Sequence, residues 1–181
     1  MKKKRGRAIA AIIFVLLVAA VIFWLMRMGP KFMKAEITSS NGSHYLIELP
    51  SDLQWTQLND NASLQYADHD TDLDVIVIDE SKAKIISFGL DYDLETYMKI
   101  ASRSLDSAGM YVNKPVTING NNALQTEIRR KFKGKNVTYR LTCIETPKFF
   151  YQLRVQATDE EFLKRKDDIA KIIASFRESE K

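Results

Sequence analysis

Cysteine and histidine are scarce in this sequence. Its 181 residues include one cysteine, Cys143, and two histidines, His44 and His69. A single cysteine cannot form a disulfide within the chain. Cys143 is in phase with Val137 and Leu141 in an alternating apolar run, which predicts a buried, unreactive thiol rather than a nucleophile. The histidines have no partner at a spacing suited to a metal site or a general base, so both are interpreted as surface residues.

Motifs of the common enzyme classes are also absent. The chain has no G-x-S-x-G nucleophile motif, no glycine-rich phosphate loop and no H-E-x-x-H metal motif. We therefore predict no catalytic residue and no cofactor, and a non-catalytic protein is favoured. A hydrolase is kept as the alternative. A concave pocket that holds convergent polar residues with shifted pKa values would indicate it.

Acidic residues are absent from the N-terminal part of the chain. Eight of the 27 Lys and Arg residues lie at or before Lys34, whereas all 23 Asp and Glu residues lie at or after Glu36. The sequence pI of about 9.1 therefore reflects the N-terminal segment. The rest of the chain has a net charge of about −4. This distribution gives no support for a nucleic-acid partner.

Residues 8–26 form a long uncharged stretch, AIAAIIFVLLVAAVIFWLM. At about 1.5 Å per residue this stretch spans about 28 Å as a helix, close to the ~30 Å hydrocarbon core of a bilayer. It predicts a single transmembrane anchor. Basic residues crowd segment 1–7 before the stretch, and only Arg27, Lys31 and Lys34 follow it closely. This bias favours a cytoplasmic N-terminus and a domain outside the cytoplasm, at the cell membrane.

A cleaved signal peptide is the competing interpretation of this stretch. Ala20 is the candidate cleavage residue. Cleavage there would leave residues 21–26 as an exposed apolar N-terminus, so an uncleaved anchor is favoured. A lipid-modified N-terminus is excluded, because the only cysteine lies far beyond the apolar stretch.

The remainder of the chain divides into a connector and one domain. The connector contains Gly29-Pro30 and a Ser-rich turn at residues 39–43, which predict a flexible tether. About 137 residues follow it, the usual size of one domain. The predicted segments are a cytoplasmic N-terminus at 1–7, an anchor at 8–26, a linker at 27–43 and an extracytoplasmic domain at 44–181.

Apolar periodicity predicts a sheet of about seven strands, drawn from eight candidate segments, and two helices in the domain. Asp93 is a natural N-cap and Gly109 a natural terminator of the first helix, and Thr158 to Glu161 form a capping box for the second. Short links between strands indicate a mainly antiparallel sheet with both helices packed on it, which is an α+β fold. The expected strands are 45–49, 53–58, 64–66, 73–78, 111–118, 124–132, 137–143 and 149–155, and the expected helices are 94–108 and 159–176.

Several strand and turn stretches resemble the bacterial PsbP-like domain family, which includes the PsbP and DcrB types. The resemblance covers roughly residues 45–176, and its motifs specify a fold rather than a chemistry. It implies a non-catalytic module that binds or stabilises other components of the bacterial cell envelope, with an envelope protein as partner. The stretches that carry it are Tyr45–Pro50, Trp55, Asn61–Tyr66, Val75–Glu80, the strand around Tyr151 and the closing helix that ends at Ser175-Phe176.

An acidic turn is the first of two charged clusters. Residues 68–74 read DHDTDLD, and carboxylates at alternate positions suit a hard cation such as Ca²⁺. An EF-hand loop would need glycine at Leu73 and glutamate at Asp79, so no metal site is predicted. A solvated turn is favoured, and a cation-binding module is the alternative. The weak ligand candidates are Asp68, Asp70, Asp72 and Asp74.

The second cluster is basic and lies on the later strands. It could form an interaction face for an acidic partner or an anionic polymer, although an ordinary solvated sheet face is favoured. Its members are Arg129, Lys131, Lys133, Lys135, Arg140 and Arg154.

Overall fold

The structure is a computed structural model that describes residues 32–68, 70–107, 109–132 and 134–179. The chain divides into two units, Met1–Lys31 and Phe32–Lys181. The predicted cytoplasmic segment and anchor lie outside the described residues, as do His69 and Lys133. Within the described residues, no helix is long and apolar enough to cross a membrane.

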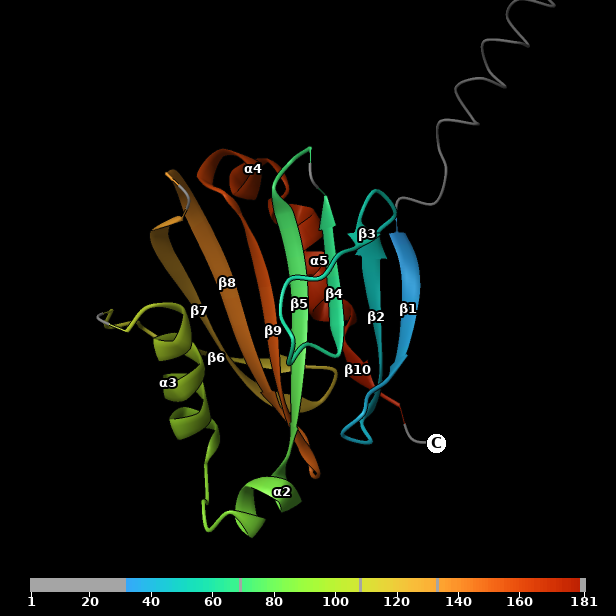
Figure 1. The fold of residues 1–181 in the computed structure, drawn as a ribbon, viewed down its shortest axis with the longest axis vertical. Coiled ribbons are helices and arrows are strands. Elements are labelled where there is room, and N and C mark those ends of the chain that lie inside the picture. Colours follow the sequence, from blue (N-terminus) through green and yellow to red (C-terminus); the bar gives the residue numbers. More distant parts are fainter. Residues whose placement is uncertain (1–31, 69, 108, 133, 180–181) are drawn as a thin grey trace, which may run out of the picture. The chain divides into compact units, whose positions relative to one another are not determined.

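A seven-stranded antiparallel sheet is the frame of the second unit (Figure 1). Its strand order is β3-β4-β5-β9-β8-β7-β6, and every neighbouring pair is antiparallel. This confirms the predicted α+β fold with a mainly antiparallel sheet. The strands are β3 Gln54–Trp55, β4 Leu64–Asp68, β5 Leu73–Ser81, β6 Lys114–Ile118, β7 Asn121–Phe132, β8 Lys135–Glu145 and β9 Phe149–Thr158.

A second sheet of three strands corrects the predicted linker. β1 (Phe32–Thr38) pairs with β2 (His44–Pro50) along its whole length, and β10 (Arg177–Glu178) pairs with the other edge of β2. The linker prediction at 27–43 is therefore wrong over Phe32–Thr38. The missed signal is an alternation of Met33, Ala35 and Ile37 with polar residues, since these apolar side chains pack against the core.

The described residues contain four helices rather than the two expected. α2 (Lys82–Ser87) was not predicted at all. α3 (Leu94–Leu105) begins as predicted, because Asp93 Oδ1 accepts a hydrogen bond from the Thr96 amide at 2.7 Å, but it ends before Gly109. The closing helix is divided into α4 (Asp159–Lys164) and α5 (Lys166–Ser175).

The break between α4 and α5 lies at Arg165. Its guanidinium lies 3.0 Å from an Asp52 carboxylate oxygen and 3.3 Å from one of Asp168. The side chain of Arg165 thus links the joint between the two helices to the turn after β2.

The predicted capping box at the start of α4 is present in part, because the Thr158 hydroxyl accepts a hydrogen bond from the Glu161 amide at 3.4 Å.

The two faces of the large sheet carry separate cores. One face packs against β2 and α5, where the rings of Tyr45, Tyr151 and Phe176 lie 4.8 to 5.6 Å apart between centroids. The other face packs against α3, where Tyr97 stacks on Phe150 at 4.5 Å. Figure 1 shows α3 on one side of the sheet and α5 on the other.

We expect β1 to be necessary for a stable domain. A chain that begins at residue 41 loses the strand that covers one edge of β2, together with its half-buried side chains. Urea unfolding followed by circular dichroism should show it to be less stable than a chain that begins at residue 31, by at least about 3 kcal/mol, the value of burying one or two apolar side chains. Equal stability of the two chains would support the tether that the sequence predicted.

Candidate functional site

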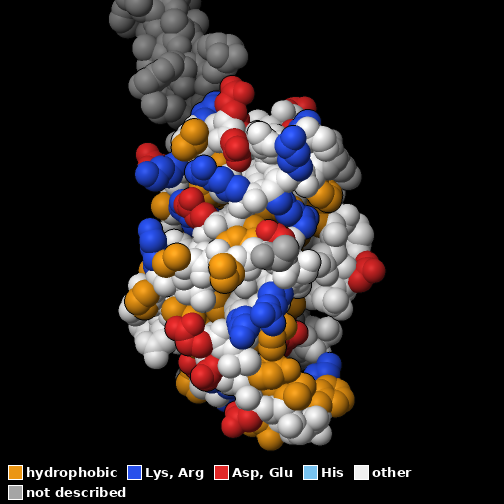
Figure 2. Space-filling model, turned by 90° about the vertical axis from the view of Figure 1, so that its left-hand side faces the viewer, with side chains coloured by type: hydrophobic (Ala, Val, Ile, Leu, Met, Phe, Trp, Pro, Cys, Tyr) orange, Lys and Arg blue, Asp and Glu red, His pale blue; other side chains and the backbone are white. Residues whose placement is uncertain are grey.

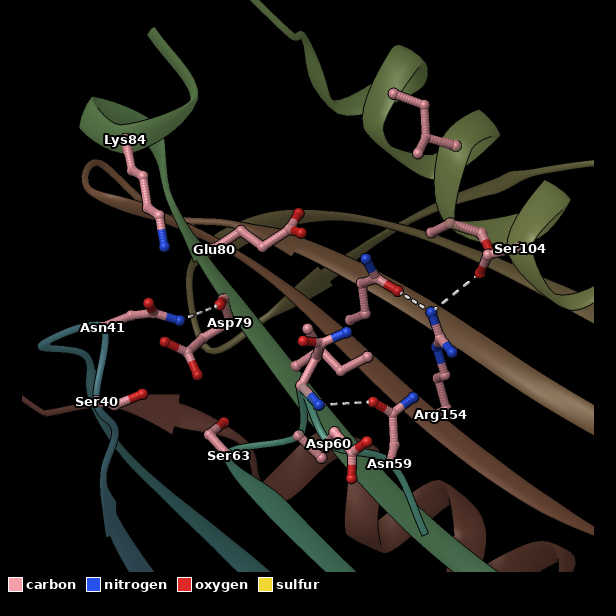
Figure 3. A pocket seen from close by; sticks show the side chains of 16 residues that line it. Ser40, Asn41, Asn59, Asp60, Ser63, Asp79, Glu80, Lys84, Ser104 and Arg154 are labelled. Atoms are coloured by element: carbon pink, nitrogen blue, oxygen red, sulfur yellow. Dashed lines mark hydrogen bonds between the residues drawn. The ribbon is translucent and has the colours of Figure 1, made fainter. Parts of the chain in front are cut away.

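β5 extends further than its neighbour β4, and a cavity lies beside the overhanging residues. β4 pairs with β5 only as far as Leu64 opposite Val77, whereas β9 pairs with β5 up to Ser81. The cavity has a volume of about 650 Å³ and is lined mostly by polar side chains (Figure 3). Its walls come from the β1–β2 turn, the segment before β4, β5, α2, α3 and β9. Because these segments are far apart in the chain, no local pattern could have predicted the site.

Asp79 of β5 forms one wall of the cavity. Its side chain is only 2% exposed, and its Oδ2 accepts a hydrogen bond from the Ser39 hydroxyl at 2.7 Å. Its Oδ1 has no hydrogen-bond partner among the described residues. The Asn41 side-chain amide donates to the Asp79 carbonyl at 2.9 Å, which attaches the β1–β2 turn to the edge of β5.

Arg154 of β9 lines the cavity from the α3 face of the sheet, the face opposite to that of Asp79, and it is held by a chain of side chains. Its Nη2 donates to the Ser104 hydroxyl at 3.1 Å and to Gln152 Oε1. The Gln152 amide in turn donates to the Tyr97 hydroxyl at 3.1 Å. Asp79 and Glu80 point to opposite sides of β5, so Glu80 faces the α3 side of the cavity (Figure 3). The carboxylates of Asp79 and Glu80 and the guanidinium of Arg154 are thus all held on paired strands, β5 and β9.

The resolved pKa shifts in and below this cavity follow from burial. Burial lowers the pKa of Arg154 and raises the pKa of Tyr97. Burial also raises the pKa of the Cys143 thiol well above its usual range, and Cys143 is fully buried beneath α3, as predicted. Each shift moves the titration of Tyr97 and Cys143 further from neutral pH, which is the opposite of what a general base or a nucleophile needs.

Three carboxylates of the predicted acidic turn, those of Asp68, Asp72 and Asp74, contact different partners. Asp68 accepts from the Asp70 amide at 3.0 Å and from the Thr71 hydroxyl at 2.5 Å. Asp72 forms an ion pair with Lys135 at 2.5 Å, and Asp74 accepts from the Gln156 amide. In the part of the chain that is described, no three His, Cys, Asp or Glu side chains converge on one metal position.

The predicted basic face is not one surface, because its members lie on opposite sides of the sheet. Arg140 of β8 lies opposite Glu127 of β7 and forms an ion pair with it, so the two side chains are on the same side of the sheet. Because alternate residues of a strand point to the same side, Arg129 and Lys131 of β7 also lie on this side. Lys135 and Arg154 lie on the other side, and Arg154 lines the cavity. The sequence predicted a single face because the register between β7, β8 and β9 was not known.

Next to the cavity, α2 presents an exposed apolar surface that the sequence analysis missed. We call Ile86, Phe88 and Leu90 the α2 surface; they are 62%, 71% and 44% exposed. Apolar side chains gather at the corresponding lower end of the molecule in Figure 2. No residue of α2 is buried. The signal was present as the run IISFGL at residues 85–90, which fits neither the preceding strand nor the following helix.

Comparison with known proteins identifies the fold. No family model and no curated protein matches the sequence. LpqN of Mycobacterium tuberculosis, a protein involved in cell envelope biogenesis, superimposes with a TM-score of 0.59 at 16% identity, over 82% of this chain and 92% of LpqN. The cyanobacterial PsbP (CyanoP) of Synechocystis sp. PCC 6803 superimposes with a TM-score of 0.55 at 9% identity, over 84% of this chain and 95% of CyanoP. The domain has a PsbP-like fold.

A third structure, from Bacteroides thetaiotaomicron, superimposes on the PsbP-like domain with a TM-score of 0.56 at 10% identity, over 83% of this chain and 50% of that one. Sequence identities this low establish the fold and leave the function to be argued from the surface. The fold expected from the resemblance to PsbP-like domains is thus confirmed.

Cys143 should be inert in the folded protein. Because its thiol is buried and its pKa is raised, we expect no reaction with a disulfide reagent such as DTNB under native conditions and full reaction in urea. A Ser87→Cys variant, exposed at the end of α2, provides a matched reactive thiol. Rapid native labelling of Cys143 would contradict its placement beneath α3.

Asp68 should stabilise the domain in a pH-dependent way. Burial alone would raise its pKa, but hydrogen bonds from Thr71 and Asp70, together with Arg165, lower it overall. Stability from this carboxylate is therefore present above its unfolded pKa and is lost as the pH falls through the lower folded value. Asp68→Asn should destabilise the domain by about 1 kcal/mol at pH 7.

The difference between wild type and Asp68→Asn should shrink as urea unfolding is repeated at pH values below about 4, near the ordinary pKa of an aspartate side chain. Asp167→Asn in α5 serves as a control for the loss of one negative charge. A difference that grows on acidification would contradict the lowered pKa of Asp68.

Proposed function

We propose that this chain is a membrane-anchored, non-catalytic binding or scaffolding module of the bacterial cell envelope, with its domain outside the cytoplasm. The observation that carries the proposal is the α2 surface, where three large apolar side chains lie exposed in α2 and in the turn directly after it. The fold shared with LpqN supports the envelope assignment. The uncharged stretch at residues 8–26, with its basic lead, supports the anchor.

The α2 surface is held in place by polar contacts and by Ile85, which is half-buried and packs against the core on the α3 side of the sheet. The Ser81 hydroxyl accepts from the Lys84 amide at 3.4 Å at the start of the helix. Lys82 forms an ion pair with Glu145 at 2.6 Å, and its amine lies 4.6 Å from the centre of the Phe150 ring. These contacts fix the helix and leave its apolar side chains available to a partner.

The chemistry of the α2 surface fits a protein partner with an apolar groove. Burying an exposed Ile, Phe or Leu side chain stabilises a complex by roughly 1.5–3 kcal/mol each. Lys84 and Asp91 border the three residues in the sequence and supply a polar rim, as at other protein interfaces. A partner that covers this surface would therefore gain several kcal/mol from a small contact area.

The described residues do not favour the two alternatives from other functional classes. A hydrolase would need convergent groups titrating near neutral pH, and the raised pKa values of Tyr97 and Cys143, which lie below the cavity, move away from it. A cation-binding module would need the acidic side chains to converge, and Asp68, Asp72 and Asp74 each contact a different partner. Binding without catalysis remains the function that the surface supports best.

Site-specific photocrosslinking in intact membranes tests the proposal. A photoreactive amino acid at Phe88 of the full chain should give one discrete crosslinked protein. The matched control is Leu163 of α4, which is 70% exposed but lies at the other end of the domain (Figure 1). Ile86→Ser should weaken crosslinking at position 88 by tenfold or more, which corresponds to about 1.4 kcal/mol.

The proposal would be refuted by the reverse pattern. Equal crosslinking at 88 and 163 would indicate non-specific contact, and absence of any product at 88 would remove the docking surface. Retention of the product in the Ile86→Ser chain would show that the apolar contact does not hold the partner.

A further inference from the structure

We propose that the free edge of β7 binds an extended, acidic segment of a partner protein, which joins the large sheet as a further strand. We call Thr126–Phe132 the β7 edge. β6 pairs with β7 only over Asn121–Gln125, so among the described strands the β7 edge is paired with β8 alone. The upper half of β7 lies away from α2 in Figure 1, and the proposal does not depend on the α2 surface.

A strand with one free side carries backbone groups that another strand can bind. In an antiparallel ladder, alternate residues direct their N–H and C=O groups to the same side, so part of the β7 edge offers these groups outward. No backbone hydrogen bond joins the β7 edge to a described segment other than β8. An added segment would continue the line of β6 beyond Lys114, which lies opposite Gln125. In this mode of binding, backbone bonds supply affinity and side chains supply specificity.

The side chains on the two faces of the β7 edge set the pattern of the partner. Ile128 belongs to the core beneath α3, so the even-numbered residues of the edge point to the α3 side. Arg129 and Lys131 point to the opposite side and are exposed. Glu127 on that side already forms an ion pair with Arg140. Arg129 and Lys131, in contrast, have no hydrogen-bond or ion-pair partner among the described residues.

Charge favours an acidic segment over a second copy of this chain. The β7 edge holds three basic residues, Arg129, Arg130 and Lys131, against the acidic Glu127, a net charge of +2. Two such edges would repel each other, because like charges on paired strands are destabilising. A glutamate or aspartate opposite Arg129 and Lys131 gives a favourable cross-strand pair instead. Figure 2 views the molecule from the side of β7, and Lys and Arg side chains gather in its upper half.

Apolar side chains border the β7 edge on the α3 side. Phe132 is 40% exposed at one end. At the other end, the Thr126 hydroxyl donates to the Val112 carbonyl at 3.1 Å, and Val112 is 81% exposed. A partner segment that meets these residues with apolar side chains buries their surface. The expected segment therefore alternates acidic residues, which face the two cations, with apolar residues, which face the α3 side.

Fluorescence anisotropy of the full chain in nanodiscs of neutral lipid tests this proposal. A short labelled peptide that alternates valine with glutamate should bind, and the same peptide with lysine in place of glutamate should not. The double variant Arg129→Glu, Lys131→Glu should weaken binding of the glutamate peptide tenfold or more and should bind the lysine peptide instead. The matched control, Lys99→Glu with Lys148→Glu, makes the same change of charge at exposed positions of α3 and of the β8–β9 turn and should leave both affinities unchanged.

Hydrogen exchange distinguishes strand addition from attraction between charges. With the glutamate peptide bound, those amides of residues 126–132 that face the free side should exchange tenfold more slowly or less, because they become hydrogen-bonded to the peptide backbone. The amides of β4, at the far side of the sheet, should not change. Poly-glutamate, a charged polymer that is disordered at neutral pH, should not protect residues 126–132.

Three results would overturn the proposal. Failure of the glutamate peptide to bind the wild-type chain would show that the cations only keep the β7 edge from pairing. Unchanged affinity in the Arg129→Glu, Lys131→Glu chain, with a thermal midpoint that shows it to be folded, would mean that these residues do not select the segment. Equal protection by poly-glutamate, or protection confined to other residues, would exclude strand addition at the β7 edge. Crosslinking at Phe88 is decided independently of all three, so the two proposals fail separately.

Discussion

The pairing of β5 with β9 is the interaction on which the rest of the structure depends. The two strands are paired from Asp74 opposite Gln156 to Ser81 opposite Phe149, and most of β5 is buried. A strand with layers on both faces must be apolar almost throughout, as the run LDVIVI is. β9 pairs with β5 beyond the point where β4 ends, so the last residues of β5 lie at an edge of the sheet. Ser81 then caps α2, and the cavity lies beside the overhang.

Two surfaces of different chemistry meet at this end of the domain. The cavity is polar and rigid, because Asp79 and Arg154 are on paired strands and are restrained by Ser39, Gln152 and Ser104. The α2 surface is apolar and is attached by few contacts. Lys84 connects the two, since it lies in α2 next to the α2 surface and lines the cavity. In the proposed function, a partner on α2 would therefore lie close to the mouth of the cavity.

The fold was predictable from the sequence to a large extent, and the site was not. Long periodic segments such as β7 and α3 were predicted because their apolar residues alternate or form a stripe that a core must bury. β1 was missed because turn-forming residues on both sides hid a short alternation, and α2 because it is short and only Ile85 packs against a core. The cavity and the division of the basic residues between two faces depend on strand register and strand overhang, which no local pattern encodes.

Hydrogen exchange of the full chain offers the most direct measurement of the central claim that this is a binding module. Amide exchange would be compared between native membranes and the purified chain in detergent. The account predicts slower exchange in membranes for the amides of residues 84–90, which lie in and after α2, with no change in the central strands β5, β8 and β9. Identical exchange of residues 84–90 in the two preparations would contradict it, because an occupied α2 surface cannot open as freely as a bare one.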